Sequence, residues 1–273
     1  MDKSFRSIFK TGSKTYFYSS LFFPKNIKND VFTLYAFVRT ADDLVDATPQ
    51  KKTEFEAFVL EYHQALAGKA SSNILIASFV ELLHKYDLEP SWVEAFLTAM
   101  RQDLVKKEYA TLSELEAYMY GSAEVIGLMM AQILSLPQES YPAAALQGKA
   151  MQYLNFIRDI EEDTFLGRTY LPKSILKEYG LADLSIKTYK KNPQQFEAFI
   201  QAELKRYQTW QDQAQAGFEY IPKRYRVPIQ TAAEMYGWTA RTIACNPKII
   251  FEKKVKPSKA QLITQAVWLL FTA

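Results

Sequence analysis

The sequence predicts an all-α fold, and three observations lead to that prediction. Only 9 of the 273 residues are Gly, which is about half the usual share and disfavours architectures built from strands and tight turns. Helix-start signals recur along the chain, and no segment keeps a strand-like alternation of apolar and polar residues for long. No internal repeat or low-complexity linker divides the sequence. We therefore expect a single domain, residues 1–273, made of about ten helices.

Local signals place the starts of the predicted helices. Three capping boxes, in which Glu follows a Ser or Thr by three residues, begin at Thr53, Ser91 and Thr111. A further helix is expected after Asn192, where Pro193 suits the first helical position. Ser140 and Pro142 give a similar signal for a helix of about six turns. This helix is expected to continue through "NFIRDIEED".

The cysteine and histidine content narrows the chemistry. The single cysteine, Cys245, excludes an intramolecular disulfide and a zinc cluster of thiolates, and it fits a reducing compartment. The two histidines, His63 and His84, lie in no HExxH or His–Asp pairing, so an imidazole-bound metal is disfavoured. Any metal would need oxygen ligands, which favours Mg²⁺, Mn²⁺ or Ca²⁺.

One acidic segment, "FVRTADDLVD" at residues 37–46, interrupts an otherwise apolar helix pattern. Asp42 and Asp46 are four residues apart, so on a helix both carboxylates point from one face, about 6 Å apart along the axis. Arg39 lies on the same face. Asp43 points roughly 100° away and is expected near the surface.

A second acidic segment, "NFIRDIEEDTFLGRTYLP", begins at Asn155. Asn155, Asp159 and Asp163 are again spaced four residues apart, and Arg158 is next to Asp159. These side chains would form one stripe on a helix. Two separate helices are therefore expected to offer oxygen ligands at one-turn spacing, each with an arginine.

The two stripes together indicate a metal-assisted phosphate site. A single pair of carboxylates with a nearby arginine is usually a solvated ion-pair network, but two such stripes on otherwise apolar helices are much less expected by chance. Mg²⁺ takes one or two carboxylates from a protein and completes its coordination with water and phosphate oxygens. Arginine forks bind the same phosphates. The sequence therefore predicts a magnesium–diphosphate site facing a helical core.

With these motifs the sequence resembles the squalene/phytoene synthase family along most of its length. The family's DxxxD motif matches Asp42 and Asp46, and its NxxxDxxxD motif matches the stripe that begins at Asn155 and is followed by "GRTYLP". The segments "SKTYFYSSLFFP", "YMYGSAEVIGLMM" and "AAEMYGW" are also similar to family segments. Two positions depart from the pattern. Gly12 stands where some relatives have histidine, and Glu124 replaces a small residue, so the floor of the pocket is expected to differ.

The resemblance implies a terpenoid synthase helical bundle with a central active-site cavity. It also implies a prenyltransferase that joins two prenyl diphosphates head to head in two steps. In the first, one allylic diphosphate ionises and the double bond of a second molecule attacks the cation, giving a cyclopropylcarbinyl diphosphate. In the second, that intermediate ionises and rearranges to a hydrocarbon.

The resemblance also implies roles for particular residues. The expected ligands of Mg²⁺, with Mn²⁺ as an alternative ion, are Asp42, Asp46, Asn155, Asp159 and Asp163. The expected catalytic residues are the four aspartates of this set with Arg39 and Arg158. The expected diphosphate-binding residues are Ser13, Lys14, Thr15, Tyr35, Arg39, Arg158 and Tyr236.

Aromatic faces can stabilise a carbocation that must be kept from water. The expected prenyl-pocket residues are Tyr16, Phe17, Tyr120 and Phe156, and Tyr236 is a further candidate. An aromatic residue taken alone is more often ordinary core.

The sequence leaves several activities open. The first choice is phytoene synthesis from two geranylgeranyl diphosphates via prephytoene diphosphate, without NADPH, as in carotenoid biosynthesis. The second is synthesis of dehydrosqualene, squalene or presqualene diphosphate from two farnesyl diphosphates. Head-to-tail elongation is disfavoured, because "DDLVD" fits DDxxD but the second motif does not. A non-catalytic prenyl-lipid-binding subunit would be expected to lack an aspartate or arginine, and all are present.

The carboxy-terminal region suggests where the protein works. Residues 221–260 contain nine Lys or Arg and two Glu and precede the apolar "AVWLLFTA", so a peripheral membrane contact is one interpretation and a solvated basic surface is the other. No signal peptide or membrane-spanning run is recognised, and we expect a cytoplasmic protein. A nucleic-acid partner is not expected, because the net charge is only +3 and no binding fold is recognised.

Overall fold

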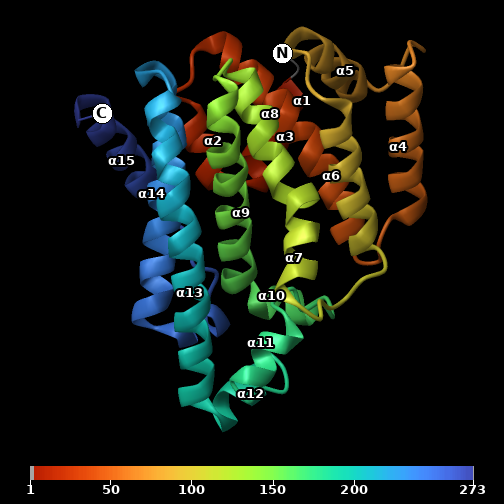
Figure 1. The fold of residues 1–273 in the computed structure, drawn as a ribbon. Coiled ribbons are helices and arrows are strands. Elements are labelled where there is room, and N and C mark those ends of the chain that lie inside the picture. The colour runs from red at the N-terminus through yellow and green to blue at the C-terminus, as the bar shows by residue number, and fades with distance from the viewer. Residues whose placement is uncertain (1–2, 273) are drawn as a thin grey trace.

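Three long helices run side by side along the length of the molecule (Figure 1). They are α9 (Tyr141–Arg158), α13 (Pro193–Gln215) and α14 (Lys223–Cys245), and α9 packs against both of the others. The computed structural model describes residues 3–272. Over these residues the fold contains helices and no strand, with one isolated bridge between Glu108 and Thr169. The all-α prediction is confirmed.

The described residues form fifteen α-helices rather than about ten, and the expected helix from Ser140 through "NFIRDIEED" is divided into α9 and α10. The remaining α-helices are α1 (Lys3–Gly12), α2 (Lys14–Ser20), α3 (Lys25–Asp46), α4 (Lys52–Leu66), α5 (Ile74–Tyr86), α6 (Pro90–Asp103), α7 (Leu112–Met119), α8 (Val125–Ile133), α10 (Ile160–Phe165), α11 (Lys173–Glu178), α12 (Ile186–Lys191) and α15 (Lys259–Thr272). The 3₁₀ segments are η2 (Gln138–Ser140), η3 (Ala216–Tyr220) and η4 (Pro247–Phe251), and η1 (Tyr120–Glu124) is a π-helical turn.

Only one of the three predicted capping boxes caps a helix. Thr111 precedes α7, and its hydroxyl accepts a hydrogen bond from the amide of Glu114 at 3.3 Å. The predictions at Thr53 and Ser91 are wrong, because α4 already begins at Lys52 and α6 begins at Pro90. Pro90 suits that position because the first helical residue needs no amide proton.

The predicted starts of α9 and α13 are confirmed in position. Asn192 directly precedes α13, which begins at Pro193, and Ser140 directly precedes α9. Neither side chain makes a capping hydrogen bond. The backbone geometry around proline therefore sets these starts rather than a side-chain cap.

Small residues bring α8 and η1 close to α9. A Cβ atom on Gly127 would overlap the carbonyl oxygen of Ala144, and one on Gly148 would overlap that of Ala123. The absent side chains let these helices approach at backbone contact. This close packing fixes one wall of the central space.

Two local irregularities shape that space. The π-helical turn η1 interrupts the helical run from α7 to α8, and turns of this kind occur often at functional sites. Helix α9 ends at Arg158. The next residue, Asp159, has φ −100° and ψ 16°, and α10 follows it. No helix within residues 3–272 is both long enough and apolar enough to cross a bilayer.

Candidate active site

A cavity of about 760 Å³ lies in the middle of the bundle. Its charged end is lined by Asp42, Asp46, Asp159 and Asp163, and its apolar end by residues such as Ala143, Leu136 and Phe218. Ala143 and Asp159 are sixteen residues apart along α9 and its end, so these two ends are separated by about 24 Å. The cavity is therefore long, with charge at one end.

The first acidic motif lies on the last turns of α3. The Arg39 Nη1 atom donates to Asp42 Oδ2 at 2.6 Å, and Arg39 also pairs with Asp43. Asp43 has a side chain that is 56% exposed and does not line the cavity, as the spacing predicted. Asp46 accepts a hydrogen bond from Arg168 Nη1 at 2.5 Å. Asp42 and Asp46 both line the cavity.

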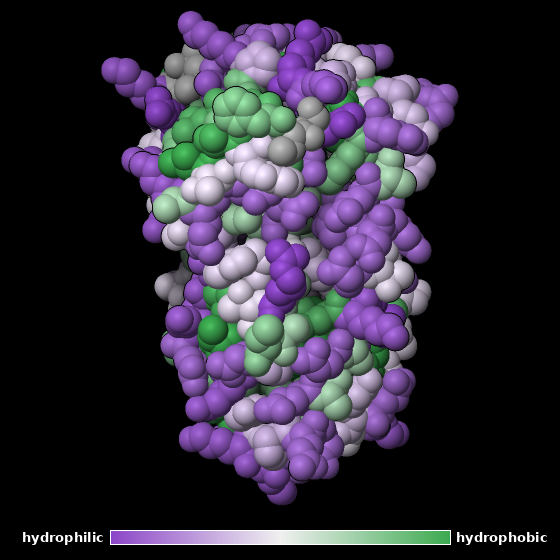
Figure 2. All heavy atoms as spheres, turned by 90° about the vertical axis from the view of Figure 1, so that its left-hand side faces the viewer, coloured by the Kyte–Doolittle hydropathy of each residue, from purple (hydrophilic) through white to green (hydrophobic). Residues whose placement is uncertain are grey.

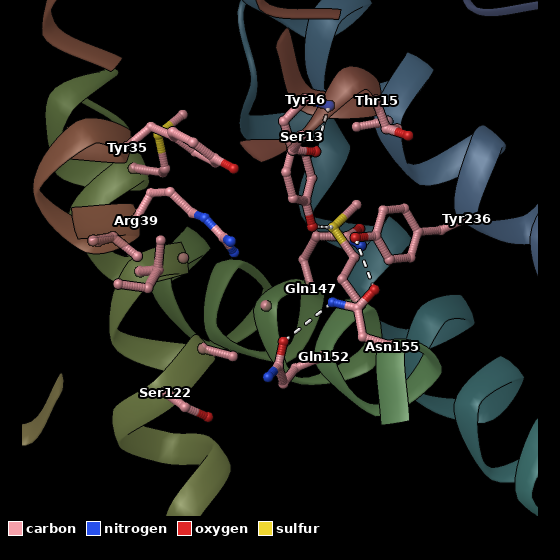
Figure 3. A pocket seen from close by; sticks show the side chains of 18 of the residues that line it. Ser13, Thr15, Tyr16, Tyr35, Arg39, Ser122, Gln147, Gln152, Asn155 and Tyr236 are labelled. Atoms are coloured by element: carbon pink, nitrogen blue, oxygen red, sulfur yellow. Dashed lines mark hydrogen bonds between the residues drawn. The ribbon is translucent and has the colours of Figure 1, made fainter. Parts of the chain in front are cut away.

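The second acidic motif spans the break between α9 and α10. The Asp159 amide donates to the carbonyl of Asn155, and the Asp163 amide donates to the carbonyl of Asp159, so one-turn spacing persists across the break. All three side chains line the cavity. Arg158 forms a two-pronged contact with Asp159, at 2.7 and 2.5 Å. The Tyr236 hydroxyl donates to Asn155 Oδ1 at 3.2 Å (Figure 3).

The carboxylates at the acidic end are buried and repel one another, which disfavours their charged forms. Burial, together with the neighbouring Asp46, raises the pKa of Asp42 to about 7 despite Arg39. Burial and the charges of Asp159 and Asp46 raise the pKa of Asp163 to about 8. Burial also acts on Asp159, but its hydrogen bonds from Arg158 hold its pKa below the ordinary value. A cation bound beside these carboxylates would stabilise their charged forms.

The donor set fits a hard divalent cation. It consists of carboxylate and amide oxygens, which Mg²⁺ prefers. Within residues 3–272 no three acidic, histidine or cysteine side chains are already grouped tightly enough to enclose an ion. The protein would therefore supply a few oxygens, and the diphosphate and water would supply the others.

The expected diphosphate-binding residues converge on the same cavity. Ser13, Lys14, Thr15, Tyr35, Arg39, Arg158 and Tyr236 all line it. Ser13 caps α2 by accepting a hydrogen bond from the Tyr16 amide at 3.3 Å. In Figure 3, Arg39 reaches from α3 into the space between Tyr35 and Asn155. The structure brings these residues together, while their roles remain predictions.

Gly12 has a structural reason to lack a side chain. A Cβ atom there would lie 2.6 Å from the Tyr35 hydroxyl oxygen and 3.1 Å from carbons of Arg39. In this chain, therefore, the absence of a side chain makes room for these two cavity residues. Glu124 does not line the cavity and faces Lys149 at 3.7 Å, so the expectation that it alters the pocket floor is wrong.

Two of the four expected prenyl-pocket aromatics line the cavity. Tyr16 stacks on Tyr236 with ring centres 5.7 Å apart, and Phe156 stacks on Tyr170 at 4.3 Å. Burial and the nearby Tyr236 raise the pKa of Tyr16 well above its usual value, so this phenol stays neutral.

The other two aromatics lie elsewhere, and these predictions are corrected. Phe17 is buried in the core against Phe9 and Phe32 and does not line the cavity. Tyr120 is 44% exposed at the first residue of the π-helical turn. The wider turn changes the register, and Ser122 and Ala123 line the cavity instead.

The sequence interpretation missed a buried network behind Asp46. Arg168, only 5% exposed, also donates from Nη2 to the carbonyl oxygens of Val45 and Asp103. The Asp103 carboxylate accepts hydrogen bonds from Tyr118 and Tyr170 at 2.7 and 2.9 Å. The motif "GRTYLP" contained the signal for Arg168, whereas Asp103 comes from α6 and no motif pointed to it.

Part of the basic carboxy-terminal segment also reaches the cavity. Lys254 lies 3.3 Å from Asp159 and pairs with Glu162, and both Lys254 and Lys256 line the cavity. These lysines add positive charge at the end where a diphosphate would lie. The sequence interpretation had assigned their segment only to the surface.

Comparison with known proteins gives one family match. The squalene/phytoene synthase family model matches residues 9–261. A chloroplastic phytoene synthase from an Oncidium hybrid cultivar is 28% identical over 262 residues, covering 91% of this chain and 62% of that protein. The 15-cis-phytoene synthase of Synechococcus elongatus is 25% identical over 266 residues, covering 91% and 85%. The chain thus spans less than two thirds of the Oncidium relative.

Solved structures share the fold. A crystal structure of a dehydrosqualene synthase in complex with ligand superposes with a TM-score of 0.88 at 25% identity, covering 99% of this chain and 96% of that one. The squalene synthase HpnC from Alicyclobacillus acidocaldarius gives 0.78 at 23% identity, covering 88% and 92%. The latter likeness supports the fold alone.

Proposed function

The chain belongs to the squalene/phytoene synthase family, and from this premise we propose that it is a prenyltransferase that joins two prenyl diphosphates head to head. One observation carries the proposal. Two acidic motifs, each with its own arginine, line the charged end of a long cavity whose other end is apolar. A prenyl diphosphate has the same division into a charged head and an apolar chain.

Ionisation of the first substrate requires that its leaving diphosphate be held. When bound, Mg²⁺ would neutralise the charge that develops on this group. The chain's own contribution comes from Arg39, Arg158 and Lys14, whose cationic groups line the same end. Hydrogen bonds to a phosphate from such groups are short and strong, so they favour departure of the diphosphate over its return.

The rest of the cavity protects and orients the cation. Its apolar wall excludes water, which would otherwise capture the cation as an alcohol. The stacked rings of Tyr16 and Tyr236, and of Phe156 and Tyr170, offer aromatic faces. The double bond of the second substrate attacks, a proton is lost, and a cyclopropylcarbinyl diphosphate forms. Its own ionisation and rearrangement, with loss of a further proton, would give the hydrocarbon.

We propose geranylgeranyl diphosphate as the substrate and phytoene as the product, via prephytoene diphosphate. The support comes from relatives named phytoene synthases and from a cavity of about 760 Å³, toward the upper end of the roughly 300–1,000 Å³ range of ligand pockets. Small residues such as Ala143 and Gly217 line its apolar end, where they pack against each other. Long chains fit such a space.

A second candidate is condensation of two farnesyl diphosphates. It is favoured by the high structural similarity to a dehydrosqualene synthase, with a TM-score of 0.88 over 99% of this chain. The two candidates share the charged end and differ in the length of chain that the apolar end must hold.

Product analysis tests both candidates. Purified protein would be incubated with Mg²⁺ and either substrate, with and without NADPH. We expect a C40 hydrocarbon from geranylgeranyl diphosphate, independent of NADPH, and loss of product in Asp159→Ala with helical content retained. A C30 product alone would move the assignment to the second candidate, and absence of product from both substrates would contradict the proposal.

We also propose that the enzyme acts at a membrane surface, because its hydrocarbon product would not dissolve in water. The basic and apolar carboxy-terminal region is the candidate contact.

A further inference from the structure

Helix α15 has two apolar faces, and only one is packed. The packed face consists of Leu262, Ala266 and Leu269. The exposed stripe consists of Ile263, Val267, Leu270 and Phe271. Exposure within this stripe runs from 39% at Ile263 to 85% at Phe271. Residues at these spacings share a helix side, so the stripe is a continuous surface that no other described part of the chain covers.

The exposed stripe lies on one side of the molecule, next to helices that reach the cavity. Helix α15 packs against α2 and α14, and it lies at the left of Figure 1. Figure 2 shows that side, with a hydrophobic patch near one end of the molecule and hydrophilic residues around it. Exposed apolar patches with a polar rim are typical of interaction sites.

Several residues near the exposed stripe of α15 are basic. Lys259 begins α15, and Lys223 and Arg224 begin α14, whose Val227 packs against Ala266 and Leu269. Lys25 begins α3, three residues after Phe22, which packs against the same cluster. We call Lys25, Lys223, Arg224 and Lys259 the basic rim; all four are exposed. Lys and Arg side chains close to an anionic membrane are attracted to it, and salt weakens this attraction.

The same region adjoins the apolar part of the cavity. Phe22 lies against the packed face of α15, whereas the next residue, Phe23, lines the cavity. The Phe23 ring lies 6.4 Å from that of Tyr225 on α14. A single layer of side chains therefore separates the cavity wall from the base of α15.

We propose that the exposed stripe of α15 and the basic rim dock on an anionic lipid bilayer. This places the apolar part of the cavity beside the hydrocarbon phase, so that the product passes between the end of α2 and the start of α14 into lipid. The release step rests on the proposed function, whereas docking does not.

A second copy of the chain is a poorer partner for this surface. A symmetric dimer would bring identical patches together, and the two basic rims would then face each other. Like charges across an interface are unfavourable. An anionic bilayer matches both the apolar stripe and the basic rim.

Vesicle flotation tests the docking. The full chain would be mixed with vesicles of phosphatidylcholine alone or of equal parts phosphatidylcholine and phosphatidylglycerol. We expect flotation with the mixed vesicles, weakened by salt. In Val267→Gln/Phe271→Gln the partition coefficient should fall about tenfold or more, because apolar burial is lost. The control Leu60→Gln removes an apolar side chain of intermediate exposure (58%, against 42% at Val267 and 85% at Phe271) from α4 and should float like the wild type.

A second variant tests the charge separately. Lys223→Gln/Arg224→Gln keeps the apolar stripe and should weaken binding to the mixed vesicles and reduce the salt dependence. Wild-type protein that stays unbound, or stripe variants that bind as well as Leu60→Gln, would overturn the proposal. So would a wild-type dimer that the stripe variant dissociates, because the stripe would then be a protein interface.

Turnover in detergent separates this proposal from the proposed function. If docking is correct, the stripe variant keeps wild-type turnover in detergent micelles but releases less hydrocarbon into vesicles. Inactivity of the wild type in detergent would contradict the proposed function, but it would not affect the conclusion on docking drawn from flotation. Equal transfer of hydrocarbon to vesicles by both proteins would contradict the release route.

Discussion

The Asp163 carboxyl group has no hydrogen bond or ion pair to any other side chain within residues 3–272. Its neighbours Asp42, Asp46 and Asp159 are paired with arginines. Burial and two nearby carboxylates raise the pKa of Asp163 to about 8. The folded protein therefore holds a proton, or an added cation, at a place where the unfolded chain holds neither at neutral pH.

This arrangement predicts how pH acts on the metal-free protein. The pKa of Asp163 is higher in the folded state than in the unfolded state, so its contribution is neutral at low pH, where both states are protonated. As the pH rises from about 4 to 8, ionisation favours the unfolded chain. Asp163→Asn should therefore be more stable than the wild type at pH 8, by roughly 1 kcal/mol or more, and similar to it at pH 4. Urea unfolding at both pH values measures this difference.

Glu161→Gln is the matched control, because Glu161 is an exposed acid on the same short helix. It should show no gain at pH 8. Mg²⁺ with pyrophosphate should stabilise the wild type more than Asp163→Asn. An Asp163→Asn protein that is less stable than the wild type at pH 8 would contradict the charge argument.

The buried side chain of Arg168 leads to a second prediction, on stability. Its guanidinium joins Asp46 to the backbone carbonyls of Val45 and Asp103 from a nearly fully buried position. Arg168→Ala would leave the Asp46 carboxylate without its arginine and the two carbonyls with Gln50 as their remaining donor, and it should reduce the free energy of unfolding by roughly 1–3 kcal/mol. Arg168→Lys keeps the charge but lacks the planar fork, so an intermediate loss is expected.

Urea unfolding of both Arg168 variants, with Arg206→Lys as a half-buried control on α13, checks this ranking. Equal stability of Arg168→Lys and the wild type would show that the fork itself is unimportant.

At the scale of helices, the close approach of α8 to α9 depends on a missing side chain. Gly127→Ala would place a methyl group against the Ala144 carbonyl, and overpacking of this kind destabilises by about 1–3 kcal/mol. Gly237→Ala is the matched helical control, because its methyl would meet only the flexible end of Arg241 at 3.2 Å. It should be neutral or stabilise by up to about 1 kcal/mol. Thermal unfolding of the pair decides between these outcomes, and equal effects would contradict the packing argument.

Spacing along the helices predicted the positions of some site residues and not of others. One-turn spacing was sufficient to predict that Asn155, Asp159 and Asp163 share a cavity, even though α9 ends before Asp159. Tyr120 was misplaced because a π-helical turn changes the register without a clear sequence signal. Phe17 was misplaced because an apolar aromatic at a motif position packs equally well into the core.

Contacts between distant segments were harder to predict. Asp103 and Lys254 reach the charged end from α6 and from the segment before α15. Periodicity describes which residues share one helix face but not which helices meet. The resemblance to a family supplied the overall fold, and its motifs did not include these two residues.

At the scale of the whole molecule, the length of the cavity should decide which substrate is used. Ala143 lines the apolar end and already packs against Gly217, so the longer side chain of Ala143→Leu can be accommodated only by extending into the cavity. We expect turnover of geranylgeranyl diphosphate to fall by roughly tenfold or more relative to that of farnesyl diphosphate, since differences of a methylene or more in a pocket have effects of this size. Ala143→Ser, which preserves the space, is the control. The ratio of kcat/KM for the two substrates is the measurement, and an unchanged ratio would contradict this placement of the chain end.

In the mechanism proposed above, the two acidic motifs act together to bind a diphosphate through a divalent cation. Calorimetric titration with inorganic pyrophosphate, with and without Mg²⁺, tests it without any assumption about the product. We expect binding by the wild type only with Mg²⁺, and a loss of affinity of about tenfold or more in each of Asp42→Asn and Asp163→Asn, with Asp43→Asn less affected. Binding that does not require Mg²⁺, or that survives loss of either aspartate unchanged, would contradict it.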